Sequence, residues 1–174
     1  MSRVVLSLGA NLGDREANLR EALEYLQPYL VSEVYETPPW GGDDEQPPYL
    51  NLTAIASHPD RAPIDWLAET VKAEMRAGRL RDPERPYGPR TLDVDIIAAW
   101  DESGEPVFSD DKQLTLPHPR AHLRAFVLVP WLAIEPAAQL PGVGRIRQLL
   151  GDQNLSADAR SLRRLHPIWS NDHG

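Results

Sequence analysis

Two aspartates separated by one residue are the clearest chemical signal in the sequence. Asp93 and Asp95 lie in the apolar string Leu92-Asp93-Val94-Asp95-Ile96, and on a strand both carboxylates would point to one face, with the apolar side chains on the other. Adjacent carboxylates repel unless a cation neutralises them, and hard oxygen ligands suit Mg²⁺ or Mn²⁺. The pair therefore predicts a divalent-metal site, although the same spacing also occurs on exposed strand faces that bind nothing.

Arginines gather just before these aspartates, in the segment 76–90. Of the 18 basic residues in the chain only Lys72 and Lys112 are lysines, and five arginines fall in this segment. Its two acidic residues leave it net positive within a chain of net charge -8. A solvated charged helix face is the plain alternative, but prolines at 83, 86 and 89 exclude a single helix. The segment is therefore predicted to be a loop that binds phosphate or carboxylate groups.

A proline-rich loop and the strand after it could bind a flat ligand. The loop begins at Thr37 and Pro38 and carries Trp40, and the strand brings Tyr49 and Asn51 to one face. Aromatic rings and an amide in this order could stack on a heterocycle and hydrogen-bond its edge. Residue type alone instead favours a proline turn packed over a core aromatic residue.

The segment 114–126 holds His118, His122 and Arg124. The two histidines are four residues apart, but Pro119 follows the first directly and argues against one helix that presents both to a metal. Contact of His118 and Arg124 with phosphate fits the charge pattern better.

Whole-chain composition narrows the class of protein. The chain has 174 residues, 41% of them hydrophobic, and a pI near 5.1, which predicts one folded domain and argues against a general nucleic-acid binder. It has no cysteine, which excludes disulfides, zinc-thiolate sites and thiol catalysis. With no signal pattern and no apolar stretch of membrane-spanning length, a cytoplasmic protein is expected, without membrane partners. The P-loop and dinucleotide-binding motifs are missing, so a triphosphate would have to be held by metal and arginines.

The candidate functional residues lie on helices and strands whose order can be predicted from the sequence. Apolar periodicity predicts strands at 4–8, 31–35, 49–56 and 92–100, and helices at 15–28 and 63–78. Asp14 is placed to cap the first helix, and Ile64, Leu67, Val71 and Met75 form the expected buried stripe of the second. The order βαββαβ is the ferredoxin-like pattern of an α+β fold, with an antiparallel sheet and helices packed on it.

The last third of the chain is less regular. A hairpin connection is expected at 101–111, a short strand at 114–116, a helix at 121–132 despite Pro130, and a short helix at 143–150. Residues 1–153 are predicted to form a single domain. Fraying is expected for the tail at 154–174, with docking through Leu162, Leu165, Ile168 and Trp169 as the alternative.

Six motifs together match the order and spacing of one known family. They are Ser7-Leu8-Gly9-Ala10-Asn11-Leu12, Tyr35-Glu36-Thr37-Pro38-Pro39, Tyr49-Leu50-Asn51, Gly78-Arg79-Leu80-Arg81, Tyr87-Gly88-Pro89-Arg90-Thr91-Leu92-Asp93-Val94-Asp95-Ile96 and Leu116-Pro117-His118-Pro119-Arg120. Over residues 4–150 the sequence resembles 6-hydroxymethyl-7,8-dihydropterin pyrophosphokinase. The resemblance implies a three-layer αβα sandwich with C-terminal additions. It also implies transfer of diphosphate from ATP to the pterin hydroxymethyl group, giving AMP and the pterin diphosphate used in folate biosynthesis.

The resemblance assigns roles to the matching positions. Asp93 and Asp95 resemble the carboxylates that hold two Mg²⁺ ions, and Arg79 and Arg90 resemble catalytic arginines that engage the phosphates. The residues implied to contact ATP are Leu67, Glu74, Arg81, Arg85, Ile96, Thr115, His118 and Arg124. Those implied to contact the pterin are Gly9, Thr37, Pro38, Trp40, Tyr49, Asn51, Tyr87 and Phe126. The rings of Tyr49 and Phe126 would sandwich the pterin, which reverses the packing interpretation of Tyr49, and the implied state is a monomer that binds these two small molecules.

Some positions depart from the family pattern, and two other protein classes fit part of the sequence. Pro86 is an extra residue beside Arg85, and Gln113 stands where some members direct an arginine toward ATP. A metal-dependent nuclease or glycosyltransferase would use the same aspartates, but an acidic chain with few lysines suits long polyanions poorly. A non-catalytic ferredoxin-like binding module would leave the aspartates and five arginines without a role.

Overall fold

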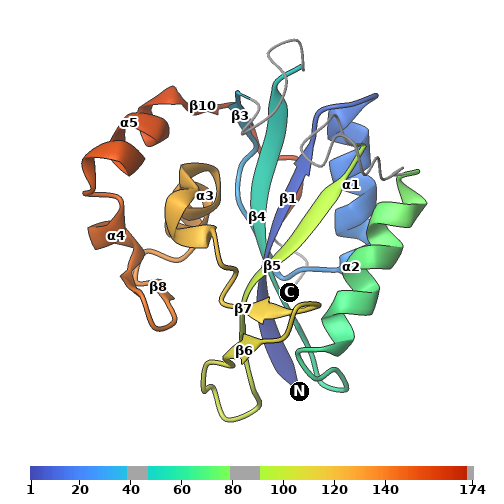
Figure 1. Ribbon diagram of the computed structural model, residues 1–174. Coiled ribbons are helices and arrows are strands. Elements are labelled where there is room, and N and C mark those ends of the chain that lie inside the picture. Colours follow the sequence, from blue (N-terminus) through green and yellow to red (C-terminus); the bar gives the residue numbers. More distant parts are fainter. Residues whose placement is uncertain (39–46, 79–90, 172–174) are drawn as a thin grey trace.

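A central antiparallel sheet organises the molecule (Figure 1). The structure is a computed structural model that describes residues 1–38, 47–78 and 91–171. The long strand β1 (Ser2–Ala10) pairs on one side with β4 (Tyr49–His58) and on the other with β5 (Asp93–Trp100). The strand order is β10-β3-β4-β1-β5, where β3 is Tyr35–Thr37 and β10 is Arg163–Arg164, and the short β2 (Leu30–Val31) also pairs with β4. This is the ferredoxin-like order that the sequence predicts, extended by one strand at the β3 edge.

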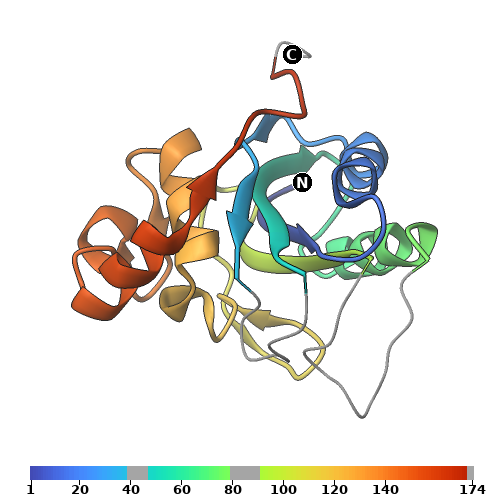
Figure 2. The same cartoon turned by 90° about the horizontal axis from the view of Figure 1, so that it is seen from above.

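Helices cover both faces of the sheet, which makes three layers (Figures 1 and 2). The helices α1 (Arg15–Leu26) and α2 (Asp65–Arg76) pack over one face, around a core that includes Val4, Leu6 and Leu8. The other face carries α3 (Ala125–Ile134), α4 (Ile146–Leu149) and α5 (Gln153–Ser161), around Val5 and Ile97. Successive residues of β1 therefore serve opposite cores, as expected of a central strand buried on both faces. No helix in the described part of the chain is long and apolar enough to cross a membrane.

The first helix begins as predicted, with the Asp14 side chain accepting a hydrogen bond from the Ala17 amide. The predicted stripe of α2 holds only at Leu67, which packs partly buried against the core. The buried residues of α2 are Trp66, Thr70, Ala73 and Glu74, whereas Ile64 and Met75 are 52% and 70% exposed. Trp66 decides the orientation, because its ring is buried in the core and its Nε1 donates to Ser2 Oγ over 2.9 Å.

Several shorter elements differ from their predictions. The strand expected at 31–35 is divided into β2 and β3, and the helix expected at 143–150 is confined to α4, because the residues before it form β9 (Gly144–Arg145), paired with β8 (Gln139–Leu140). The hairpin connection contains β6 (Ser109–Asp110) and β7 (Thr115–Leu116), and a 3₁₀ turn, η1 (Ala121–Leu123), leads into α3.

The tail docks on the body instead of fraying. Its backbone pairs with β3, and Leu155 and Ile168 are buried in the cores on the two faces of the sheet. Residues 154–171 thus follow the docking alternative, while the boundary at residue 153 stays a prediction.

Candidate active site

The two aspartates lie on one face of β5, as predicted. Asp93 pairs with Gly9 and Asp95 with Ser7 of β1, while Val94 and Ile96 between and beyond them are buried toward the α1–α2 core. Both aspartates are half-buried. A β-bulge between Val5 and Leu6 follows directly in the ladder, and bulges near functional sites re-aim side chains.

Gly9 permits a close contact between β1 and β4. A Cβ atom at this position would lie 2.7 Å from Asn51 Oδ1 and 3.5 Å from the Tyr49 ring, so any side chain would displace Asn51. The buried Asn51 amide donates from Nδ2 to Thr37 Oγ1 over 2.8 Å. This bond fixes the amide and directs Oδ1 toward Gly9. Four residues predicted from the sequence to contact one ligand therefore meet here: Gly9, Thr37, Tyr49 and Asn51.

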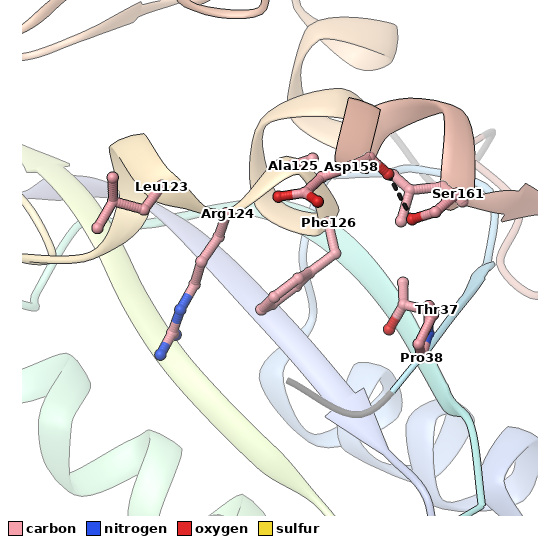
Figure 3. Close-up of a pocket in the computed structure, with 9 residues that line it drawn as sticks. Thr37, Pro38, Leu123, Arg124, Ala125, Phe126, Asp158 and Ser161 are labelled. Atoms are coloured by element: carbon pink, nitrogen blue, oxygen red, sulfur yellow. Dashed lines mark hydrogen bonds between the residues drawn. The ribbon is translucent and has the colours of Figure 1, made fainter. Parts of the chain in front are cut away.

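Arg124 connects the aspartates to the first turn of α3. Its Nη1 lies 3.6 Å from Asp95 Oδ2, and its guanidinium carbon lies 5.6 Å from the centroid of the Phe126 ring. Only 11% of the Arg124 side chain is exposed, so its charge interacts strongly with nearby groups. In Figure 3 both side chains extend from the start of α3 toward the sheet. The contact of Arg124 with Asp95, one of the two predicted metal ligands, was not predicted from the sequence.

His118 is held beside β5 through its backbone and its ring. Its amide donates to Ile97 O over 2.8 Å, and its Nδ1 accepts from the Arg120 amide over 3.1 Å. Burial, with the positive charge of Arg124, lowers the pKa of His118 to about 4, against the opposing effect of Asp93. The ring is therefore neutral near pH 7, and because Nδ1 accepts a bond, the remaining proton lies on Nε2 as a donor.

A pocket of about 260 Å³ lies between α2, β5 and the β7 segment. It gathers five of the residues implied to bind metal or ATP: Leu67, Asp95, Ile96, Thr115 and His118. Glu74 is buried on α2 but does not line this pocket. Lys112 and Gln113 do line it. Gln113 stands where some family members direct an arginine toward ATP, whereas Lys112 was not assigned to ATP from the sequence. Lys112 is exposed, and nothing in its local pattern marks it as a ligand residue.

A second pocket, of about 190 Å³, lies beside Phe126 (Figure 3). Thr37, Pro38 and Phe126, all assigned to the pterin by the sequence, contribute to it together with Arg124. Its opposite wall comes from Asp158 and Ser161 of α5 and from Leu162, the residue after that helix. Of this wall only Leu162 was marked from the sequence, among the residues expected to dock if the tail is ordered.

Some predicted site residues lie outside the described part of the chain. These are Trp40, Arg79, Arg81, Arg85, Tyr87 and Arg90, so the anion-binding loop stays a prediction. Among the described residues, no group of three or more His, Cys, Asp or Glu side chains could hold a metal. The metal site predicted at Asp93 and Asp95 stays a prediction, and its cation would have to take its other ligands from phosphate and water.

Comparison with known proteins decides the family. A family model described as 7,8-dihydro-6-hydroxymethylpterin-pyrophosphokinase (HPPK) matches residues 5–136, which is more than half of the chain. The chain belongs to this family. A relative from Mycobacterium tuberculosis, named 2-amino-4-hydroxy-6-hydroxymethyldihydropteridine pyrophosphokinase, is 45% identical over 178 residues, covering 97% of this chain and 93% of the relative. A relative of the same name from Mycobacterium leprae is 47% identical over 156 residues, covering 86% and 80%.

Solved structures of the HPPK family share the fold. The chain superposes on a Plasmodium falciparum HPPK-DHPS wild-type crystal structure with pteroate at a TM-score of 0.65 and 14% identity, covering 94% of this chain. It spans 47% of that chain, so the likeness concerns about half of the Plasmodium protein. The α+β sandwich expected from the sequence is confirmed.

Proposed function

We propose that the protein carries out the pyrophosphokinase reaction of its family in the region between β5, β7 and the start of α3. The carrying observation is the position of Asp95, which lines the 260 Å³ pocket and lies 3.6 Å from Arg124. Arg124 in turn contacts the Phe126 ring, which lines a pocket together with Thr37, the residue that holds the Asn51 amide. This arrangement supports a nucleotide on one side of the carboxylates and a flat heterocycle on the other.

The nucleotide would occupy the pocket between α2 and β7. Leu67 and Ile96 offer apolar contact for a base, and Thr115 lines the pocket with its hydroxyl donating to Asp111 O. The Nε2 proton of His118, and Arg124 beside Asp95, offer donors for phosphate oxygens. Glu74 and the four arginines of the undescribed segment, Arg79, Arg81, Arg85 and Arg90, complete the set that family membership supports. Arg79 and Arg90 are proposed to neutralise charge on the transferred diphosphate.

The aspartates fit Mg²⁺. They supply paired carboxylate oxygens on β5, the strand at one edge of the sheet, and their partial burial leaves room for phosphate and water ligands. Two Mg²⁺ ions held there would polarise the phosphates and lower the pKa of the incoming hydroxyl. Arg124 would balance the Asp95 charge beside the metal and hold the first turn of α3 against the substrates.

The pterin would lie between the Tyr49 and Phe126 rings. Asn51 Oδ1, oriented by the bond from Nδ2 to Thr37, would accept a hydrogen bond from an N–H group on the pterin edge. The backbone near Thr37 and Pro38 would add contacts, and Trp40 and Tyr87 are proposed to approach from the undescribed segments. The hydroxymethyl oxygen of the pterin would attack the β-phosphorus of ATP. The bond from that phosphorus to the oxygen bridging to the α-phosphate would break, and the hydroxyl proton would pass to solvent.

The products test this reaction. Purified protein is incubated with ATP, Mg²⁺ and 6-hydroxymethyl-7,8-dihydropterin, and adenine nucleotides and pterins are resolved by chromatography. AMP should appear in step with the pterin diphosphate, and omission of Mg²⁺ should stop both. ADP with a pterin monophosphate, or ATP consumption that does not depend on pterin, would contradict the proposal.

We infer that the protein acts as a cytoplasmic monomer. Light scattering coupled to size exclusion should give a mass near 19.5 kDa. A stable dimer at assay concentration would contradict this inference.

A further inference from the structure

The C-terminal arm, defined here as residues 162–171, adds a strand to the sheet beside the substrate-binding strand β3. Arg163 pairs with Glu36 and Arg164 with Tyr35. Two backbone bonds extend the pairing, from the Leu165 amide to Val34 O over 2.8 Å and from the Val34 amide to His166 O over 3.0 Å. β3 has only three residues and pairs on its other side with β4. About half of its lateral support therefore comes from the arm.

Side chains tie the arm to the residues that precede β3. Asn171 accepts from the Val31 amide over 2.9 Å and donates to Val31 O over 3.2 Å. Arg164 Nε lies 3.3 Å from Glu33 Oε2, and His166 Nε2 lies 3.2 Å from Glu16 Oε1. Ile168 anchors the arm, because its side chain is buried in the α1–α2 core. The arm thus holds the chain from β2 to β3 along its whole length.

The end of α5 and the first residue of the arm reach the same place from the other side. Ser161 and Leu162 line the pocket beside Phe126 together with Thr37 and Pro38 at the end of β3, and Figure 3 shows Ser161 across the pocket from Thr37 and Pro38. Thr37 is the residue that fixes the Asn51 amide. A shift of β3 would therefore move both a pocket wall and the acceptor that orients Asn51.

We propose that the C-terminal arm is a positioning element for the pterin, because it holds β3 where Thr37 can orient Asn51. The proposal rests on the proposed function, in which Thr37 and Asn51 serve the pterin. It concerns the pterin alone, since the nucleotide pocket is lined by α2, β5 and the β7 segment, which the arm does not pair with. Loss of the arm's backbone pairing should weaken pterin binding and leave ATP binding unchanged.

The test variant removes one backbone hydrogen-bond donor of the arm, and a control variant changes the same side chain but keeps that donor. Leu165→Pro cannot donate to Val34 O, whereas Leu165→Val keeps the amide and serves as the matched control. Full-length proteins are compared for the KM of each substrate and for kcat. Leu165→Pro should raise the KM for the pterin by roughly tenfold with the KM for ATP within about twofold, since a small misplacement of a binding group is enough. Equal rises in both KM values, or no rise for the pterin, would overturn the proposal.

A second variant covers the case in which proline prevents folding. Asn171→Ala removes both bonds to Val31 without changing the backbone of the arm. Amide exchange of residues 35–37 should become faster, and the dissociation constant for the pterin, measured with a non-hydrolysable ATP analogue present, should rise. Unchanged exchange and unchanged pterin affinity would count against the arm. A wild-type protein that fails to turn over ATP and pterin would instead refute the proposed function itself.

Discussion

At the scale of single residues, Asp95 has two neighbours that define its role. It lies across from Ser7 in the ladder with β1, and Arg124 approaches its carboxylate to 3.6 Å. The guanidinium offsets part of the negative charge that Asp93 and Asp95 would otherwise concentrate on one face. Arg124 therefore reduces the repulsion between the two carboxylates, and their oxygens can still serve as ligands to a cation.

Neutralising Asp95 should separate catalysis from folding. Asp95→Asn keeps the shape of the side chain but removes the charge proposed to hold Mg²⁺, so turnover should fall by about 100-fold or more. The melting temperature should change little, because the lost contact with Arg124 is offset by relief of the repulsion between Asp95 and Asp93. Asp110→Asn, at an exposed carboxylate in β6, is the control and should keep wild-type turnover. Near-normal turnover of Asp95→Asn would show that Asp95 does not hold the metal.

His118 should make folding stability depend on pH. Its pKa is lowered to about 4 in the folded protein from an ordinary value of 6.5. The unfolded chain therefore takes up the proton first, and stability is complete above pH 6.5 and declines as the pH falls toward 4. Between pH 7 and 4, wild type should lose on the order of 2 kcal/mol more unfolding free energy than His118→Gln.

Urea unfolding at several pH values measures this difference. His122→Gln leaves His118 in place and should follow the wild-type curve. Parallel curves for wild type and His118→Gln would show that the imidazole is not held neutral by its surroundings.

At the scale of elements, α1 and α2 are joined by a polar contact above the sheet. The Tyr25 hydroxyl donates to Glu69 Oε2 over 2.6 Å, and this bond, with Arg61 and Lys72 nearby, lowers the pKa of Glu69. The same contact raises the pKa of Tyr25. The two helices are thus linked by a hydrogen bond to a charged group as well as by their apolar faces.

Removing this bond should have a pH-dependent effect. Tyr25→Phe should lower the free energy of unfolding by about 1 kcal/mol at neutral pH. A carboxylate with a lowered pKa contributes stability above its ordinary value near 4.5 and loses it on acidification, so the difference from wild type should shrink as the pH falls below that value. Tyr29→Phe, at an exposed tyrosine, should change stability by less than about 0.5 kcal/mol. A difference that grows on acidification would contradict the assignment.

Features set by neighbours in sequence were predictable, and features set by distant partners were not. The Asp14 cap and the shared face of Asp93 and Asp95 follow from local periodicity and hydrogen bonding, and both are confirmed. The buried face of α2 was missed because Thr70 and Glu74 are polar, and only the packing of Trp66 beneath the helix explains why they are inside. Periodicity describes one element at a time, so it cannot select the face that a tertiary partner requires.

The candidate site divides in the same way. The family motifs include Gly9, which pairs with Asp93 and whose close contact with Asn51 leaves no room for a side chain. The Arg124–Asp95 contact and the α5 wall were not predicted, because each joins segments far apart in the chain. Such contacts depend on how the layers stack rather than on any local pattern.

At the scale of the whole molecule, the tail belongs to the folded unit. Ile168 is 8% exposed and packs in the same core as β1 and α1. Ile168→Ala should therefore lower the unfolding free energy by about 2 kcal/mol or more, a loss that a frayed tail would not produce. Met75→Ala, at a side chain 70% exposed, is the apolar control and should cost less than about 0.5 kcal/mol. Equal stability of wild type and Ile168→Ala, measured by denaturant unfolding, would indicate an undocked tail.

The outermost strand has a consequence for self-association. β10 places two exposed arginines, Arg163 and Arg164, along the β3 edge of the sheet. At the opposite edge, Val107 and His118 donate to the outer carbonyls of β5 at Ala99 and Ile97. Covered and charged edges resist the addition of strands from other molecules, which is the first step of β-aggregation. During folding, a chain whose last residues have not yet docked leaves β3 open, and that species should be the one most prone to aggregate.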